Sequence, residues 1–219
     1  AKTDLEKYSR VADIVKTGLI NFAVILPLLF TLNQNALAFE FGVGTHFGQG
    51  KGNPSVAFIW MSDAGMTSFR DEIYWKNMEF KPGKIAPNAK ALLALKAFTD
   101  ANQHDFNPVL ILSYGNPIYD KGSQPTSEQG RQGFAAYAKW LAGRLKGKVE
   151  YFEVWNEWNL GSGTVPKKLN YGNPVDYVKL AGISYDAIKK ENPAAKVIVG
   201  AIGGDRENWP WLQDAIKAG

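Results

Sequence analysis

Short β-rich runs alternate with helical patterns along most of this chain, and this alternation limits the possible folds more than any other feature. The strand candidates are residues 39–47, 67–70, 108–114, 149–155 and 195–201. Strands that alternate with helices favour βαβ units, in which helices cover a parallel sheet. The run Val109–Leu112 is apolar at every position, which suits a strand buried on both faces. The predicted fold class is therefore α/β.

Helical patterns lie between and after these strands. Helices are expected up to Gly65, over residues 86–101, from Thr126 onward, from Asn173 to about residue 192, and over residues 209–218. In the second helix, Leu92, Leu95 and Phe98 share one face, and Pro87 suits the first turn. The sequence therefore predicts the positions of the helices and also which side of the second helix faces the core.

Two helix starts carry local signals. Thr126 and Gln129 form a capping-box pattern, and Asn173 is a capping residue followed by Pro174. The Thr126 helix also has an apolar stripe with spacings of three and four residues. Its members are Phe134, Tyr137, Ala138, Leu141 and Leu145.

The first 38 residues do not fit the alternation. A polar start with four basic side chains is followed by an apolar run at residues 18–32 and by the small-residue ending Ala36-Leu37-Ala38. These are the parts of a secretory signal peptide, and we expect cleavage after Ala38. An uncleaved N-terminal anchor is the alternative, although the run is short for a bilayer span of roughly 20 residues. The expected location is secreted or periplasmic, with any membrane contact made only through an uncleaved leader.

The composition limits the classes of ligand and partner that this chain is expected to bind. The formal net charge is +4, and the basic residues are mixed with acidic ones, which does not indicate a nucleic-acid-binding face. The chain has no Cys and 2 His, which excludes a disulfide framework and a Cys-based zinc site. Nothing in the sequence indicates an oligomeric state.

Polar residues follow each predicted strand, where parallel α/β folds gather their functional groups. In chain order they are His46; Arg70, Asp71 and Glu72; Tyr114 and Asn116; Asn156, Glu157 and Asn159; and Asp205, Arg206 and Glu207. The fourth group is the most informative, because Trp155 and Trp158 flank the Asn156-Glu157 pair. Glycoside hydrolysis needs a carboxylic acid that protonates the leaving oxygen, and apolar neighbours help to keep such an acid neutral.

The segment Trp155-Asn156-Glu157 resembles the acid/base motif of clan A glycoside hydrolases, which are retaining enzymes on (β/α)8 TIM barrels. The resemblance implies that Glu157 is the catalytic acid/base and that Asn156 binds the substrate. Arg70 matches the Arg that the clan often carries at the end of its second strand. The arginine would hold the catalytic pair in register and keep the nucleophile ionised, although a plain ion pair with Asp71 or Glu72 is also open.

Other segments are most similar to family 39. Gly42–Phe47 resembles its first strand, and residues 69–83 resemble the second-strand region of family 39 and family 5 members. Tyr114-Gly115-Asn116-Pro117 is similar to the end of the third strand in bacterial family 39 proteins that cut exopolysaccharides. The resemblance implies hydrolysis of a β-linked glycan or exopolysaccharide, with an oligo- or polysaccharide as partner and no cofactor. Further substrate-binding candidates are His46, Trp75, Tyr114, Asn116, Trp155 and Trp158. Each Trp is equally compatible with core packing.

An eight-stranded barrel typically needs about 250 residues. Residues 39–219 are therefore expected to form a partial barrel of about five βα units, without the strand-seven Glu that serves the clan as nucleophile. Three alternatives remain open. The first is a complete five-stranded doubly wound sheet, and the second is a non-catalytic carbohydrate-binding protein on a degenerate barrel. The third is a nucleotide-binding protein, although Gly200–Gly204 lacks the spacing of the phosphate-binding fingerprints.

Overall fold

The computed structural model describes residues 40–163, 172–204 and 209–219. The expected leader, residues 1–38, and the strand-end candidates Asp205, Arg206 and Glu207 lie outside the described residues. All elements below belong to one unit, Phe41–Gly219. In the described part of the chain, no helix combines the length and the apolar character that a membrane span requires.

Five parallel strands form the central sheet, and their order in space is their order in the chain. They are β1 (Gly42–Gly44), β2 (Ser68–Tyr74), β5 (Val109–Ser113), β6 (Tyr151–Val154) and β7 (Lys196–Ile198). A doubly wound sheet reverses its strand order at a switch point, whereas a barrel does not. The unbroken order excludes the doubly wound alternative for this sheet.

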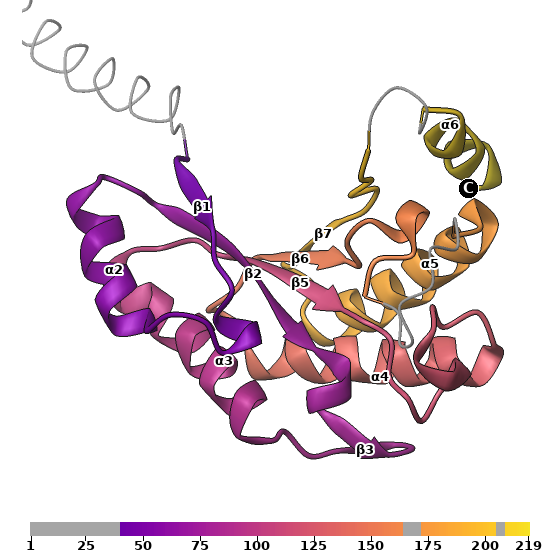
Figure 1. Ribbon diagram of the computed structural model, residues 1–219, viewed down its shortest axis with the longest axis horizontal. Coiled ribbons are helices and arrows are strands. Elements are labelled where there is room, and N and C mark those ends of the chain that lie inside the picture. Colours follow the sequence, from indigo (N-terminus) through magenta and orange to yellow (C-terminus); the bar gives the residue numbers. More distant parts are fainter. Residues whose placement is uncertain (1–39, 164–171, 205–208) are drawn as a thin grey trace, which may run out of the picture. The chain divides into compact units, whose positions relative to one another are not determined.

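The helices are α2 (Pro54–Asp63), α3 (Ala89–Asp100), α4 (Glu128–Arg144), α5 (Pro174–Glu191) and α6 (Trp209–Ala218). Figure 1 shows α3, α4 and α5 on the same side of the sheet, as in one sector of a (β/α)8 barrel. The predicted α/β fold and its barrel-like order of elements are confirmed.

The helix starts follow local hydrogen bonding. The Asn173 side chain accepts from the backbone N–H groups of Val175 and Asp176, which confirms the predicted cap of α5. The predicted start of α4 at Thr126 is wrong by one residue, because Ser127 accepts from the N–H of Gly130 at 2.9 Å. α3 likewise begins later than predicted, after the capping side chain of Asn88.

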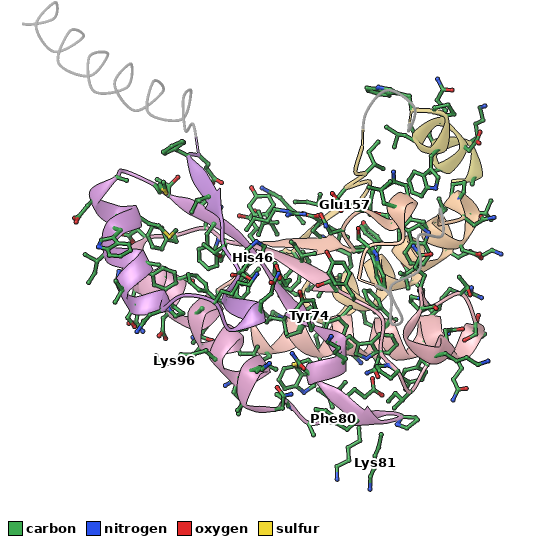
Figure 2. The ribbon with its side chains drawn as sticks, in the orientation of Figure 1. His46, Tyr74, Phe80, Lys81, Lys96 and Glu157 are labelled. Atoms are coloured by element: carbon green, nitrogen blue, oxygen red, sulfur yellow. The ribbon has the colours of Figure 1, made fainter. Side chains whose placement is uncertain are left out.

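The region after β2 differs from the prediction. The strand was expected to stop at Arg70 but continues to Tyr74, so Arg70 lies within the strand and not at its end. A short antiparallel hairpin follows, made of β3 (Glu79–Lys81) and β4 (Lys84–Ile85), and it turns through Gly83 at φ 74°. Figure 2 labels Phe80 and Lys81 on this hairpin. A strand of charged residues gives no apolar alternation, which is why the sequence did not predict its length.

The core lies between the sheet and the helices. All five members of the predicted α4 stripe are fully buried. On α3 the prediction is only partly right: Leu95 and Phe98 are buried, whereas Leu92 is 56% exposed and Ala91 points inward instead. Leu93 is also exposed, at 42%, so neither of the two adjacent leucines faces the core, and packing against the sheet selected the face that carries Ala91, Leu95 and Phe98.

Replacement of Leu141 by Ala is expected to lower the free energy of unfolding by about 2–5 kcal/mol, because it leaves a cavity in a fully buried site. Urea denaturation followed by circular dichroism measures the loss. Leu92→Ala is the matched control, and its exposed side chain should cost less than about 1 kcal/mol. Equal losses for the two variants would contradict this account of the core.

Candidate active site

Four candidate residues follow the C-terminal ends of parallel strands at one edge of the sheet, and the fifth, Arg70, lies within β2 and reaches Asn156 from there. Arg70 lies on β2, His46 follows β1, Tyr114 follows β5, and Asn156 and Glu157 follow β6. Figure 2 labels His46 and Glu157 at this edge, together with Tyr74 at the end of β2. Direct hydrogen bonds link three of the five candidates.

Arg70 is held by a carboxylate two strands away. Its Nε and Nη2 donate to the two carboxylate oxygens of Glu153 on β6, at 2.8 and 2.6 Å. The Arg70 side chain is 40% exposed and that of Glu153 only 5%. Hydrogen bonding to Glu153 raises the pKa of the Arg70 guanidinium, so the group is a permanent cation. The alternative ion pair with Asp71 or Glu72 is therefore wrong.

The same guanidinium fixes Asn156. Arg70 Nη2 donates to Oδ1 of Asn156 at 2.8 Å, and Nδ2 of Asn156 donates to the Tyr114 hydroxyl at 2.9 Å. A cation on one side and a phenol on the other specify how the carboxamide is oriented. Burial raises the pKa of Tyr114, so its hydroxyl stays protonated at neutral pH. The structure thus joins Arg70, Asn156 and Tyr114 in one polar network.

Glu157 sits in a strained turn immediately after this network. Its backbone is left-handed, at φ 53° and ψ 47°, and its N–H donates to the carbonyl of Ala201 at 2.8 Å. The Ser162 hydroxyl donates to Oε2 of Glu157 at 2.8 Å. A Cβ on Gly203 would lie 2.7 Å from both Cδ and Oε1 of Glu157. The carboxyl group is therefore bounded by the loop after β7.

The glycine-rich stretch after β7 thus has a different role from phosphate binding. Gly203 donates its N–H to Oδ1 of Asn159 at 3.0 Å and accepts from Nδ2 at 2.8 Å. This reciprocal pair holds the loop close to Glu157, where only a glycine leaves room for the carboxyl group. Close approach to a side chain explains Gly203 without a nucleotide.

Two substrate-binding candidates belong to the protein interior, which corrects the prediction. Trp75 is fully buried, its ring stacks on Tyr119 at 4.8 Å, and its indole N–H donates to Glu79 at 2.6 Å. Asn116 is also buried, and its Nδ2 donates to the carbonyl of Glu79 at 2.9 Å. Both side chains support the β3–β4 hairpin and offer no surface to a ligand.

Trp155 and Trp158 need the same correction. Both rings are buried, with centroids 5.1 Å apart, so neither is open as a platform for a sugar. Their indole N–H groups donate to backbone carbonyls, that of Trp155 to Ser162 at 3.2 Å and that of Trp158 to Asn173 at 3.1 Å. The two tryptophans shape the loops that carry Glu157.

His46 lies at the neighbouring end of β1 and contacts a second group of side chains. Its Nδ1 lies 3.4 Å from Oε1 of Glu72, and its side chain is 56% exposed. Glu72 also accepts from Gln49 at 2.7 Å and from the Tyr74 hydroxyl at 3.2 Å. The exposed ring leaves His46 available to a ligand, whereas Glu72 is already engaged by its neighbours.

Asp71 points to the opposite face of β2. Its carboxylate accepts from the Thr45 hydroxyl and from the N–H of Phe47, each at 2.6 Å. Burial raises the pKa of Asp71, and the hydrogen bond from Thr45 opposes the shift. Asp71 therefore anchors the turn η1 (Phe47–Gln49) after β1 and does not belong to the polar edge. Within residues 40–163, 172–204 and 209–219, no three His, Asp or Glu side chains are grouped to hold a metal ion.

Sequence reasoning missed three members of the site: Glu153, Ser162 and Gly203. A charged residue between Phe152 and Val154 in an apolar strand was a usable signal, because a buried carboxylate needs a partner. Ser162 and Gly203 gave no signal, since their roles depend on loops that fold back over Glu157.

Solved structures of glycoside hydrolases share this arrangement of strands and helices. A family 39 glycoside hydrolase from the gut symbiont Bacteroides cellulosilyticus WH2 has a TM-score of 0.59 at 26% identity, over 73% of this chain and 31% of its own. The exo-β-1,4-mannosidase Op5Man5 from Opitutaceae bacterium strain TAV5 has a TM-score of 0.58 at 16% identity, over 73% and 32%. A GH5_18 protein from Streptomyces cattleya, in complex with GlcNAc, also has a TM-score of 0.58 at 16% identity, over 74% and 44%.

These similarities define the class of fold as part of a TIM barrel of the kind found in clan A glycoside hydrolases. The chain spans about a third of the length of the first two structures. No family model and no curated protein matches the sequence.

Glu153→Gln is expected to lower the free energy of unfolding by about 1–3 kcal/mol. The loss should be below the roughly 3–5 kcal/mol of a fully buried pair, because water reaches part of Arg70. Glu150→Gln, immediately before β6, is the control: its carboxylate is 42% exposed and pairs with Lys196, so removing the charge should cost less than about 1 kcal/mol. Denaturation curves of both variants test this difference, and a Glu153 variant as stable as the control would contradict it.

Proposed function

We propose that this chain forms part of a retaining glycoside hydrolase of clan A, with Glu157 as the acid/base. The observation that carries the proposal is the Asn156-Glu157 pair at the C-terminal end of the fourth strand of the parallel sheet, with Asn156 held between Arg70 and Tyr114. Functional groups of TIM barrels gather at this edge. The similarity to the family 39 structure, at 26% identity, supports glycan hydrolysis as the activity.

The proposed reaction uses two carboxyl groups. Glu157 gives its proton to the glycosidic oxygen as the bond from the anomeric carbon to that oxygen breaks, and the electron pair leaves with the alcohol. A second carboxylate, which we place on a strand beyond β7 in a longer protein, bonds to the anomeric carbon. Water then attacks that carbon as its bond to the second carboxylate breaks, which releases the carboxylate, and Glu157 takes up a proton from the water. Two displacements retain the anomeric configuration.

The other residues of the network bind and orient the sugar. Asn156 offers a fixed carboxamide to a sugar hydroxyl, and the strengthening of such a bond in the transition state contributes to the rate. Arg70 keeps that carboxamide in place and leaves part of its guanidinium open to the ligand. The exposed His46 ring offers a further polar group at the end of β1.

The finer assignments are part of the same proposal. We place the protein closest to family 39, with a β-linked glycan or an exopolysaccharide as substrate, on the strength of the segments at residues 42–47 and 114–117. Export follows from the signal-peptide pattern of residues 1–38, with an uncleaved anchor as the alternative. The burial of Trp75, Trp155 and Trp158 weakens the non-catalytic alternative, which required these rings as sugar platforms.

Glu157→Gln should lower kcat/KM about 10²- to 10⁴-fold on unactivated β-glycosides, because the amide cannot supply the proton. The measurement uses the longest protein that the gene encodes and a panel of β-glucosides, β-mannosides and β-xylosides. Glu128→Gln is the control, since its carboxylate lies on the outer surface of α4 and is 71% exposed. The proposal fails if the Glu157 variant hydrolyses these substrates as fast as the control does.

A second experiment separates an acid/base from a merely structural residue. Azide needs no general base, so adding it to a Glu157→Ala variant should restore turnover of an activated aryl glycoside and give a glycosyl azide of retained configuration. An azide product of inverted configuration would overturn the retaining mechanism.

A further inference from the structure

The backbone from Glu157 to Gly163 folds back on itself, so that the end of the segment lies beside Glu157. It passes through the short helix η5 (Trp158–Leu160) and then through two left-handed glycines, Gly161 at φ 68° and Gly163 at φ 75°. The backbone N–H of Ser162 donates to the carbonyl of Glu157 at 3.3 Å. The glycines permit a turn tight enough to place the Ser162 side chain beside the Glu157 carboxyl group.

Ser162 is held in this place from two further directions. The buried indole of Trp155 donates to the Ser162 carbonyl at 3.2 Å. The ring of Tyr114 packs so closely against Gly163 that an added Cβ would overlap it. Because its backbone is held on both sides, the Cβ of Ser162 is fixed close to Glu157, and its hydroxyl donates to Oε2 of Glu157 at 2.8 Å.

The two oxygens of Glu157 are consequently not equivalent. Oε2 accepts from Ser162, and Oε1 faces the position where Gly203 has no side chain. We infer that Ser162 is a positioning residue for Glu157, which leaves Oε1, on the Gly203 side, to exchange the proton with the substrate. This inference rests on the proposed function.

The hydrogen bond has a role in the chemical step itself. As the proton moves from Oε1 to the glycosidic oxygen, negative charge develops on the carboxyl group and is shared by Oε2. A hydroxyl that already donates to Oε2 stabilises this charge more strongly than it stabilises the neutral acid. The effect should therefore appear only where proton transfer assists departure of the leaving group.

The test compares two leaving groups. A 2,4-dinitrophenyl glycoside loses a stable phenolate without protonation, whereas a methyl glycoside needs the acid. In the longest protein that the gene encodes, Ser162→Ala should lower kcat/KM about tenfold on methyl β-glycosides, in line with loss of one hydrogen bond to a charged group. On the dinitrophenyl glycosides of the same sugars, the change should stay below about twofold. Ser162→Thr keeps the hydroxyl and should restore the rate on the methyl glycosides.

The controls separate this inference from the proposed function. Ser55→Ala, on the exposed part of α2, should change neither rate. If Glu157→Gln discriminates between the two leaving groups but Ser162→Ala slows both equally or neither, the role of Ser162 is overturned and the function stands. If Glu157→Gln itself does not discriminate, the proposed function fails.

A measurement on the 219-residue chain tests the contact without any hydrolysis. Ser162→Ala, Glu157→Ala and the double variant form a thermodynamic cycle in urea denaturation. We expect the double variant to lose less stability than the sum of the single losses, because both single changes remove the same hydrogen bond. Additive losses would overturn the assignment of Ser162.

Discussion

A carboxylate that is buried in the middle of a strand requires a cation within reach, and in this protein that requirement ties β2 to β6 across β5. Glu153 is almost completely removed from water, and an unpaired charge in that position would cost several kcal/mol. Arg70 reaches it with two parallel hydrogen bonds, which suit the planar guanidinium. The pairing fixes Arg70, and Nη2, which donates to Glu153, also donates to Asn156 and fixes its carboxamide. The polar edge of the sheet thus depends on one ion pair.

The backbone conformation of residues 155–157 orients the other side chains of the site. Trp155 and Glu157 both have positive φ, at 64° and 53°, although neither is a glycine. Such residues cost of order 1–3 kcal/mol each and persist only where the surroundings hold them. Here burial of the Trp155 ring and the hydrogen bond from Glu157 to Ala201 hold them. The alternation of left-handed and ordinary residues turns Asn156 toward Arg70 and Glu157 toward Ser162 and Gly203.

Features that depend on residues close in the sequence were predicted correctly, whereas features that depend on tertiary packing were not. Asn173 and Pro174 specify the start of α5 through hydrogen bonds to the next residues, so the prediction was correct. The α4 stripe was correct because its period reports burial directly. The length of β2 was missed and the buried face of α3 was only partly right, because charged strand residues, and a helix with apolar residues on more than one side, are compatible with more than one local arrangement. For the tryptophans near Glu157 the sequence was equally compatible with a sugar platform and with core packing, and the structure shows that they fill the interior beneath the loops.

The sequence by itself determined the alternation of strands and helices and the Asn156-Glu157 pair at a strand end. These properties depend on neighbours along the chain, and local hydrogen bonds and side-chain period fix them. Only the tertiary structure decided that Arg70 pairs with Glu153 rather than with Asp71 or Glu72, and that Ser162 and Gly203 bound the Glu157 carboxyl group. The physical reason is that parallel strand pairing and the folding back of loops bring together groups as far as 86 residues apart in the sequence. Because an unpaired buried charge is unfavourable, the buried carboxylate of Glu153 then pairs with the cation that the fold brings near it.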